Sequence, residues 1–333
     1  HGADHRSVAR EAMTTTDVHQ HLWSERLLGL LAARMRPPLL RRVGGDWVLR
    51  LDGEPEMTMD PSAHDPDSRA GELREAGIDR GLVCLSSPLG IESLPPEEAV
   101  PLLDAHNDDA LALDAPFGAW GALALGLGDA GADAVDGLLD RGAVGISLPA
   151  AALATRTGLA RCAQVLERLE RRSRPLLVHP GPAPWGARPR GADDVPGWWP
   201  ALTDYVAQMS AAWHAFVAWG RPAHPELRVV FAMLAGGAPL HLERLDARGG
   251  PVDAAHDPGL FYDTSSYGAR AIDAMVRSVG IDQLVHASDR PVVERRGAPP
   301  LGDAAEAAMR VANPERLLGD PNRVRERHPA VAA

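Results

Sequence analysis

The chain has 333 residues, which suits one large domain, and 45% of them are hydrophobic, enough for a sizeable core. Lysine and arginine number 34 against 45 aspartates and glutamates, so the net charge is −11. No basic stretch is interleaved with aromatic residues, which argues against nucleic acid as a partner. No apolar run reaches the length of a membrane span, and residues 1–12 lack the apolar centre of a signal peptide.

The two cysteines, Cys84 and Cys162, lie far apart in mostly apolar contexts. We expect both to be buried free thiols, which fits a reducing compartment, and therefore expect a cytoplasmic protein. The folded part is expected to start at Met13, with residues 1–12 as a disordered arm or an expression remnant.

In chain order, a strand-like run at 17–21 comes first. A long excursion to about Pro66 follows, with a helical pattern at 26–36 and a small hairpin around 47–51. Further short apolar runs then lie at 81–86, 117–123, 143–148, 175–180, 228–234, 260–265 and 284–289. Helical patterns separate them, at 63–76, 96–113, 129–141, 159–172, 200–219, 240–248 and 269–279.

Eight such runs alternating with helices are typical of a parallel sheet whose strands are covered on both faces. Closing the sheet gives an α/β fold, the (β/α)8 TIM barrel, with an insertion after strand 1 and a single domain over 13–333. An open doubly wound sheet is the alternative. No Gly-x-Gly-x-x-Gly follows an early strand, which disfavours it.

The first run carries two histidines, His19 and His21, which a strand would point to the same side. In a (β/α)8 barrel, functional groups gather where the strands end. The other strand ends add His179 on strand 5, Asp263 on strand 7 and Asp289 on strand 8. Imidazoles and a carboxylate are suitable ligands for zinc or a similar divalent ion, so the sequence predicts a metal site here.

These residues stand in motifs that resemble the amidohydrolase superfamily, in its amidohydrolase-2 branch related to aminocarboxymuconate semialdehyde decarboxylase. The resemblance covers Thr16 to about Leu318. It lies in Asp-Val-His-Gln-His at 17–21, Leu-Val-His-Pro at 177–180, Ala-Gly-Gly-Ala-Pro at 235–239 with Glu-Arg-Leu at 243–245, Tyr-Asp-Thr-Ser at 262–265 and Ser-Asp-Arg-Pro at 288–291. It implies one zinc ion held by His19, His21, His179 and Asp289. The strand-4 segment at 146–149 offers no lysine to bridge a second metal.

The chain departs from this family on strand 6. The family pattern there is His-x-Gly-Gly, with the histidine as acid or base, whereas this sequence has Leu234-Ala235-Gly236-Gly237. Leu234 cannot move a proton, which counts against the usual decarboxylation. His214 and His241 are possible substitutes, although a surface position is the simpler interpretation for both. We interpret His286 as structural because alternation along strand 8 points it away from Asp289.

The preferred function is therefore metal-dependent hydrolysis of a small amide, ester or lactone, because zinc lowers the pKa of bound water to about 7 and Asp289 is placed to accept its proton. The alternatives are non-oxidative decarboxylation of an unsaturated or aromatic acid, and a catalytically impaired metal-binding protein. What surrounds Leu234 should decide among them.

Candidate substrate-binding residues are Trp23, Arg26, Trp185 and Arg290. Trp23 and Arg26 directly follow strand 1, and Trp185 belongs to a loop at 180–200 that also carries Arg188, Arg190, Trp198 and Trp199 and is suited to form a lid. The simpler interpretations are tryptophans packed in the loop or in an interface, and an Arg290 paired with a nearby acid. Asp263 is expected either to orient a ligand histidine or to cap the following helix. The expected partner is a small-molecule substrate, and a homodimer is common among similar proteins.

Overall fold

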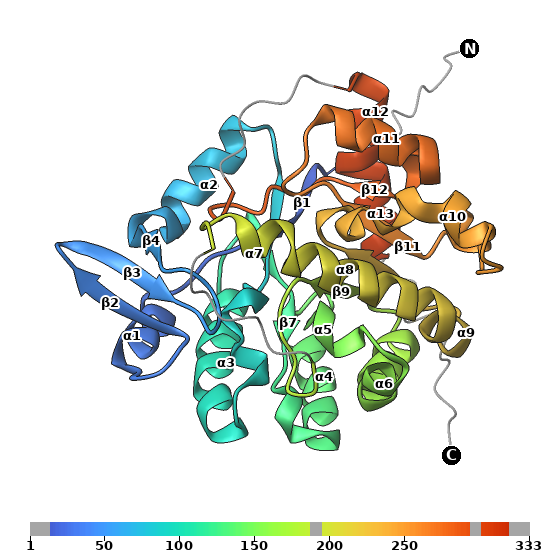
Figure 1. Ribbon diagram of the computed structural model, residues 1–333. Helices are drawn as coiled ribbons and strands as arrows, with labels where there is room; N and C mark the ends of the chain where they lie inside the picture. Colours follow the sequence, from blue (N-terminus) through green and yellow to red (C-terminus); the bar gives the residue numbers. More distant parts are fainter. Residues whose placement is uncertain (1–13, 187–194, 294–300, 320–333) are drawn as a thin grey trace, which may run out of the picture.

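The computed structural model describes residues 14–186, 195–293 and 301–319. Its centre is a ring of short parallel strands with helices around it (Figure 1). The strands are β1 (Thr16–Gln20), β5 (Arg80–Val83), β6 (Phe117–Ala119), β7 (Gly121–Ala122), β8 (Ile146–Pro149), β9 (Leu176–His179), β10 (Val229–Phe231), β11 (Leu260–Asp263) and β12 (Leu284–Val285). β6 and β7 are two parts of one barrel strand, interrupted at Trp120. The predicted (β/α)8 barrel is confirmed.

Hydrogen bonds close the ring where the two parallel sheets meet. The first sheet has the order β1-β5-β6 and the second the order β12-β11-β10-β9-β8-β7. At one junction the Val18 amide donates to the His286 carbonyl at 3.0 Å, so strand 1 lies beside strand 8. At the other, the Val144 amide donates to the Ala119 carbonyl at 2.9 Å.

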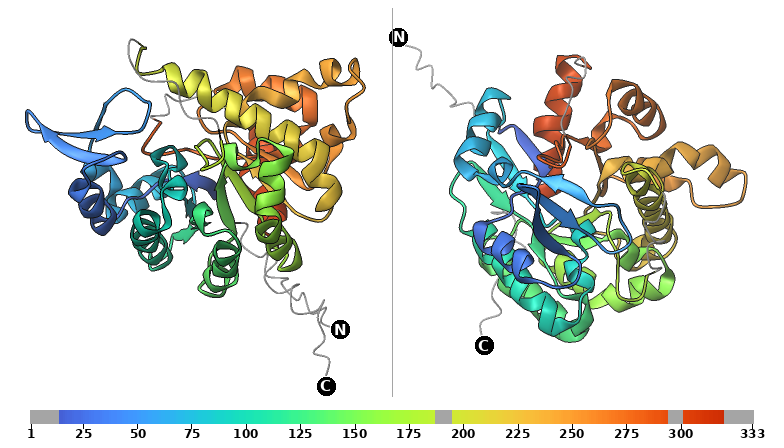
Figure 2. Two further views of the ribbon diagram at one scale, coloured as in Figure 1. Left: turned by 60° about the horizontal axis from the view of Figure 1, so that its bottom comes forward. Right: turned by 60° about the vertical axis from the view of Figure 1, so that its left-hand side comes forward.

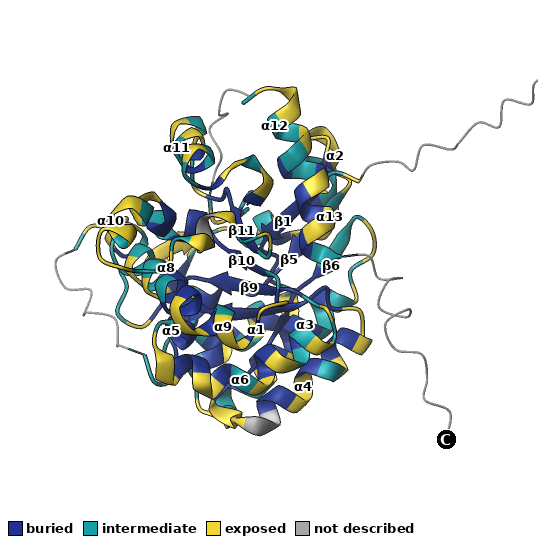
Figure 3. Ribbon diagram, turned by 90° about the vertical axis from the view of Figure 1, so that its right-hand side faces the viewer, coloured by how far each residue is buried: buried dark blue, intermediate teal, exposed yellow. Residues whose placement is uncertain are grey.

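The helices form the outer layer. They are α1 (Glu25–Ala33), α2 (Pro66–Glu75), α3 (Pro96–Leu111), α4 (Asp129–Asp140), α5 (Ala150–Leu153), α6 (Arg156–Arg171), α7 (Trp199–Leu202), α8 (Asp204–Ala215), α9 (Arg221–Ala223), α10 (Leu242–Asp246), α11 (Ala269–Val279), α12 (Asp303–Ala307) and α13 (Asn313–Leu318). Figure 3 shows strands that are buried throughout and helices that expose only their outer faces.

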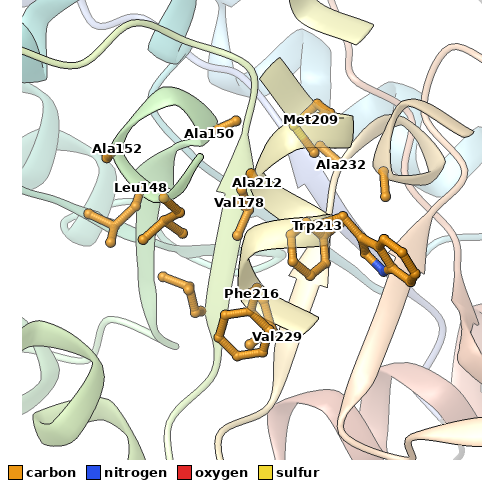
Figure 4. Close-up of a cluster of buried hydrophobic side chains, with 14 of the residues drawn as sticks. Leu148, Ala150, Ala152, Val178, Met209, Ala212, Trp213, Phe216, Val229 and Ala232 are labelled. Carbon is orange, nitrogen blue, oxygen red and sulfur yellow. The ribbon is translucent and has the colours of Figure 1, made fainter. Parts of the chain in front are cut away.

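The apolar side chains form two main layers. Inside the barrel, residues such as Leu177, Val230 and Phe261 pack together, and Trp120 donates its indole N–H to the Val18 carbonyl at 2.9 Å. Between strands and helices lies a larger cluster, part of which Figure 4 shows, with Trp213 and Phe216 from α8 and its end packed over β9 and β10. Continuous apolar strands are required because both of their faces are covered.

The predicted insertion after strand 1 is present. It contains α1 and a small antiparallel sheet of β2 (Leu39–Val43), β3 (Asp46–Arg50) and β4 (Met57–Met59). This sheet stands out from one side of the barrel (Figure 2, left, blue). A short turn, Pro61–His64, then leads into α2.

Two sequence predictions need correction. The helix expected over 200–219 is divided into α7 and α8, and ends in a π-helical turn at Phe216–Gly220. The strand expected over 228–234 stops at Phe231, because Met233 to Gly237 all adopt positive φ angles. The expected arm at 1–12 lies outside the described residues. Among the residues described, no helix is both long and apolar enough to cross a membrane.

Candidate metal centre

The two histidines of the first strand point into the end of the barrel where the strands finish. His19 and His21 are completely buried, and their ring centroids lie 4.9 Å apart. His179, the last residue of β9, places its ring centroid 4.7 Å from that of His19 and 5.2 Å from that of His21. Strands 1 and 5 lie on opposite sides of the barrel, so these rings meet across its centre.

Each ring has its Nδ1 atom beside an oxygen acceptor. His19 Nδ1 is 2.8 Å from Asp263 Oδ2, His21 Nδ1 is 2.9 Å from the Cys84 carbonyl, and His179 Nδ1 is 2.9 Å from the Pro180 carbonyl. A neutral imidazole donates from the nitrogen that faces an acceptor. With a metal bound, each Nδ1 would keep its proton and each Nε2 would offer its lone pair to the ion. Without one, His21 Nε2 hydrogen-bonds to Asp289 Oδ1 at 3.0 Å.

Asp289 adds a carboxylate to this group. Its Oδ1 atom lies 3.0 Å from His21 Nε2 and 3.5 Å from His19 Nε2, and the two Nε2 atoms are 3.2 Å apart. Its backbone, at φ 56°, is tied to strand 1 by an amide that donates to the His19 carbonyl at 3.0 Å. Asp289 thus meets the two strand-1 histidines, and His179 approaches the same two rings from across the barrel.

The electrostatics of the group favour a bound positive charge. Burial alone lowers the pKa of His21, but the neighbouring Cys84 and Asp289 raise it to about 9. Burial raises the pKa of Asp289, yet the hydrogen bond from His21 and the two nearby histidines bring it below its ordinary value. Burial and the adjacent imidazoles hold the pKa of His179 well below its usual range.

The donor set fits a single divalent cation. Four ligands arranged tetrahedrally at about 2.1 Å from a zinc-type ion lie about 3.4 Å from one another. The distances of 3.0, 3.2 and 3.5 Å among His19 Nε2, His21 Nε2 and Asp289 Oδ1 are close to this spacing. Asp263 supports the set from behind, because its other oxygen, Oδ1, accepts from the Ser265 and Met233 amides, both at 3.0 Å. Of the two roles expected for Asp263, the structure therefore supports the orientation of a ligand histidine.

Cys84 is a neighbour of the site that the sequence analysis did not assign to it. It can offer Sγ to the same group, within 4.8 Å of donor atoms of His19, His21 and His179. Its Sγ lies 3.6 Å from His21 Nδ1, and although burial raises its pKa, His19 and His21 lower it to about 7. The available signal was its place near the end of strand 2, the same criterion that identified His179.

On strand 6 the chain forms a left-handed turn. Met233, Leu234 and Ala235 have φ angles of 53°, 50° and 54°, and Gly236 and Gly237 continue the turn. Leu234 is buried in the apolar cluster between strands and helices. The position where related sequences are expected to carry a proton donor is therefore apolar.

The predicted tryptophans are not free stacking faces. Trp23 is buried and stacks on His64, with ring centroids 4.7 Å apart and an interplanar angle of 14°. Trp185 donates its indole N–H to the Ala152 carbonyl at 3.2 Å and lies under the Arg161 guanidinium. The structure supports packing roles for both, which was the simpler interpretation.

The predicted arginines are paired with acids. Arg26 forms exposed ion pairs with Asp108 and Asp109 on α3, at 3.2 and 3.8 Å. Arg290 pairs with Glu72 of α2. A substrate anion would have to compete with these carboxylates. Arg188 and Arg190 lie outside the described residues.

The histidines considered as substitutes for the strand-6 residue, and His286, lie apart from the ligand group. His214 donates from Nδ1 to the Ser210 carbonyl at 2.7 Å, and it lines a surface hollow together with His241. This agrees with the surface interpretation of both. His286 is buried on strand 8, where its amide donates to the Met309 carbonyl at 2.9 Å.

Comparisons with known proteins support the fold. No protein-family model and no curated protein matched the chain. Among solved structures, IDCase from Metarhizium anisopliae aligns with a TM-score of 0.75 and 17% identity, over 95% of this chain and 98% of its own. A 5-carboxyvanillate decarboxylase from Novosphingobium aromaticivorans, complexed with manganese, gives 0.69 and 15%, over 93% and 97%.

A third similar structure is 2,6-dihydroxybenzoate decarboxylase from Rhizobium, with a TM-score of 0.65 and 15% identity, over 92% of this chain and 98% of its own. Other matches are described as amidohydrolases. The fold of this chain is therefore the (β/α)8 barrel that these structures share, as the sequence predicted.

Proposed function

We propose that this chain is an enzyme of the amidohydrolase superfamily that catalyses the metal-dependent, non-oxidative decarboxylation of an unsaturated or aromatic carboxylic acid. The observation that carries the proposal is the convergence of four donors, from His19, His21, His179 and Asp289, at the catalytic end of a barrel. The decarboxylases among its structural neighbours favour this reaction over the hydrolysis expected from the sequence.

The residues would hold one divalent ion, for which zinc and manganese are both suitable, since one neighbour binds manganese. When bound, such an ion supplies Lewis acidity that polarises a coordinated oxygen. The chain itself contributes orientation: Asp263 fixes the His19 ring, and the carbonyls of Cys84 and Pro180 fix the other two.

Hydrolysis is the second candidate, and a specific observation favours it. The pKa of Asp289 is below its ordinary value despite burial, because His21 hydrogen-bonds to its carboxylate. Asp289 is therefore ionised at neutral pH and able to accept a proton beside the other ligands. We further propose a reducing, cytoplasmic location, which the two buried free cysteines support.

A panel assay tests the proposal. The metal-loaded protein is given carboxylic acids such as 2,6-dihydroxybenzoate and 5-carboxyvanillate, and in parallel lactones, esters and amides. We expect carbon dioxide release from at least one acid. The control is His179→Ala, which should lose both bound metal and turnover. Hydrolysis without carbon dioxide release would replace the first proposal by the second, and unchanged metal content in His179→Ala would refute the site.

A further inference from the structure

The rim of the barrel next to the left-handed turn carries a tyrosine. A helix in a (β/α)8 barrel starts at the end where the preceding strand finishes, so the first turn of α8 lies at the same rim as the metal ligands. Val206 in that turn abuts Gly236, since a Cβ built on Gly236 would be 2.6 Å from the Val206 carbonyl oxygen. Tyr205 therefore stands next to the segment where the expected histidine is replaced by Leu234.

A second contact places the same helix over the strand-5 ligand. Gln208, three residues after Tyr205, accepts a hydrogen bond from the Gly181 amide at 2.9 Å. Gly181 is the second residue after His179. The face of α8 that carries Tyr205 and Gln208 thus spans from the end of strand 5 to the turn after strand 6.

Glu54 reaches this tyrosine from the opposite side of the barrel. It lies in the loop between β3 and β4 of the strand-1 insertion, and the Tyr205 hydroxyl donates to its Oε1 at 2.6 Å. Figure 1 shows the inserted sheet to one side, with α7 and α8 extending across the front of the molecule. A bond between the strand-1 insertion and the strand-5 helix crosses the mouth above the site that strands 1 and 5 build together.

The charges around the pair agree with this position. Burial raises the pKa of Glu54, the hydrogen bond from Tyr205 lowers it, and Asp204 on α8 raises it, with a net rise. Burial first, and then Glu54, Asp289 and Asp204, raise the pKa of Tyr205 well above its usual range. Tyr205 stays protonated, so Glu54 is the member of the pair that gains and loses a proton.

We propose that Glu54 is the proton carrier of this site, in place of the histidine that Leu234 replaces, and that Tyr205 positions it. This inference rests on the proposed decarboxylation. His64, a buried imidazole near strand 1, is occupied: its Nδ1 accepts the Trp23 amide at 3.1 Å while its ring stacks on Trp23. Glu54 is half-buried, and its Oε1 atom accepts the hydrogen bond from Tyr205.

The step balances as follows. Protonated Glu54 gives its proton to the carbon that bears the carboxylate, and the C–H bond forms with an electron pair of the unsaturated system. The bond to the carboxylate then breaks, its electron pair restores the unsaturation, and carbon dioxide leaves. Glu54 remains as a carboxylate that accepts a hydrogen bond from Tyr205, and it regains a proton from water.

The test compares two glutamate-to-glutamine substitutions in the same loop. Glu54→Gln should reduce turnover of the active acid by 10²- to 10⁴-fold, the usual contribution of a general acid, with unchanged metal content. Glu56→Gln is the matched control, because Glu56 is exposed and pairs with Arg50 at 2.5 Å. Turnover of Glu54→Gln within about threefold of the control would overturn the proposal, since a lost general acid costs far more.

Two more variants separate proton transfer from structure. Tyr205→Phe removes a hydrogen bond that favours ionised Glu54, so the loss of activity with rising pH should move to higher pH. Glu54→Asp should keep more turnover than Glu54→Gln, because it retains a carboxylic acid that can give a proton. A Tyr205→Phe profile that only decreases in height, without moving, would refute the positioning role.

Infrared difference spectroscopy at a series of pH values measures the protonation of Glu54 without any substrate. The wild type minus Glu54→Gln spectrum of the metal-loaded protein should show a protonated carboxyl band that disappears with a midpoint above 4.5, the ordinary value for glutamate. Tyr205→Phe should raise that midpoint. A midpoint at or below 4.5 would refute the inference even if decarboxylation is found, whereas an expected midpoint with no acid turned over would refute only the proposed reaction.

Discussion

At the scale of single residues, the three clustered imidazoles are oriented by acceptors from three different parts of the chain. Asp263 holds His19, the carbonyl of Cys84 holds His21, and the carbonyl of Pro180 holds His179. Two of these acceptors are backbone atoms, which no side-chain substitution removes. The geometry of the donors is therefore a property of the barrel itself, and only the His19 ring depends on a side chain for its orientation.

Glu92 gives a residue-scale prediction about stability and pH. It is completely buried, Ser87 donates to its Oε1 at 2.5 Å, and its Oε2 has no partner among the described residues. Burial raises its pKa to about 7 from an ordinary value of 4.5. Between these two values the native state binds more protons than the unfolded state, so the stability that Glu92 provides is lost as pH rises.

Glu92→Gln should therefore gain stability relative to wild type as pH rises from 4.5 to 7. The difference should grow by up to about 3 kcal/mol, at about 1.4 kcal/mol for each unit of pKa shift. Urea unfolding of both proteins at several pH values measures it. A difference between the two proteins that stays constant over this range would show that Glu92 does not titrate as described.

At the scale of elements, the left-handed turn after β10 is the unusual feature. Left-handed backbone costs about 1–2 kcal/mol for each residue with a side chain, and here Met233, Leu234 and Ala235 all adopt it. The Met233 amide donates to Asp263 Oδ1 at 3.0 Å, so the turn is tied to the residue that orients His19. Such strain is maintained only where surrounding contacts determine the backbone, as they do around the candidate metal centre.

Two neighbouring glycines in this turn provide a matched pair of variants. Gly237→Ala should cost about 1–2 kcal/mol, the penalty for a left-handed backbone, because the nearest atom to its new Cβ is Leu240 Cδ1 at 3.7 Å. Gly236→Ala should cost about 2 kcal/mol more, because its Cβ would lie 2.6 Å from the Val206 carbonyl oxygen. Urea unfolding measures both, and equal losses would show that the contact with α8 is not tight.

At the scale of the whole molecule, the candidate ligands come from three strands of one ring: strands 1 and 8, which are adjacent, and strand 5, which lies opposite strand 1. Strands 1 and 8 are joined by the backbone bond from the Asp289 amide to His19, whereas strand 5 reaches the site from across the barrel. A cation bound by these residues would connect three parts of the ring that no single local interaction connects. Binding to the native state alone stabilises it by mass action.

Metal removal should therefore lower the thermal stability of the whole barrel. At a free metal concentration 100 times the Kd, zinc or manganese should add about 2.7 kcal/mol, a shift of several degrees in Tm. A chelator should reverse the shift, and differential scanning fluorimetry records it. His179→Ala should show little response to metal. A response equal to that of wild type would mean that the ion binds elsewhere.

The sequence by itself determined the barrel and the four candidate ligands. Alternating apolar runs and helical patterns depend on local periodicity, and the rule that functional groups gather at strand ends then selected His19, His21, His179 and Asp289. The same rule also selects Cys84, near the end of strand 2, but it was not applied there. Cys84 was therefore not predicted as part of the site. The left-handed backbone of Met233, Leu234 and Ala235 was not predicted, because non-glycine residues rarely adopt it and the adjoining Gly236 is packed against α8.

Only the tertiary structure decided what surrounds the ligands. The bond between His19 and Asp263 joins residues 244 positions apart, and that between Tyr205 and Glu54 joins residues 151 positions apart. Arg26 and Arg290, expected to bind substrate, pair instead with acids on α3 and α2. The partners of loop side chains depend on which residues the closed barrel brings close together. These contacts leave no periodic pattern in the sequence. Strand residues, in contrast, are positioned by the two-residue repeat of the strand itself.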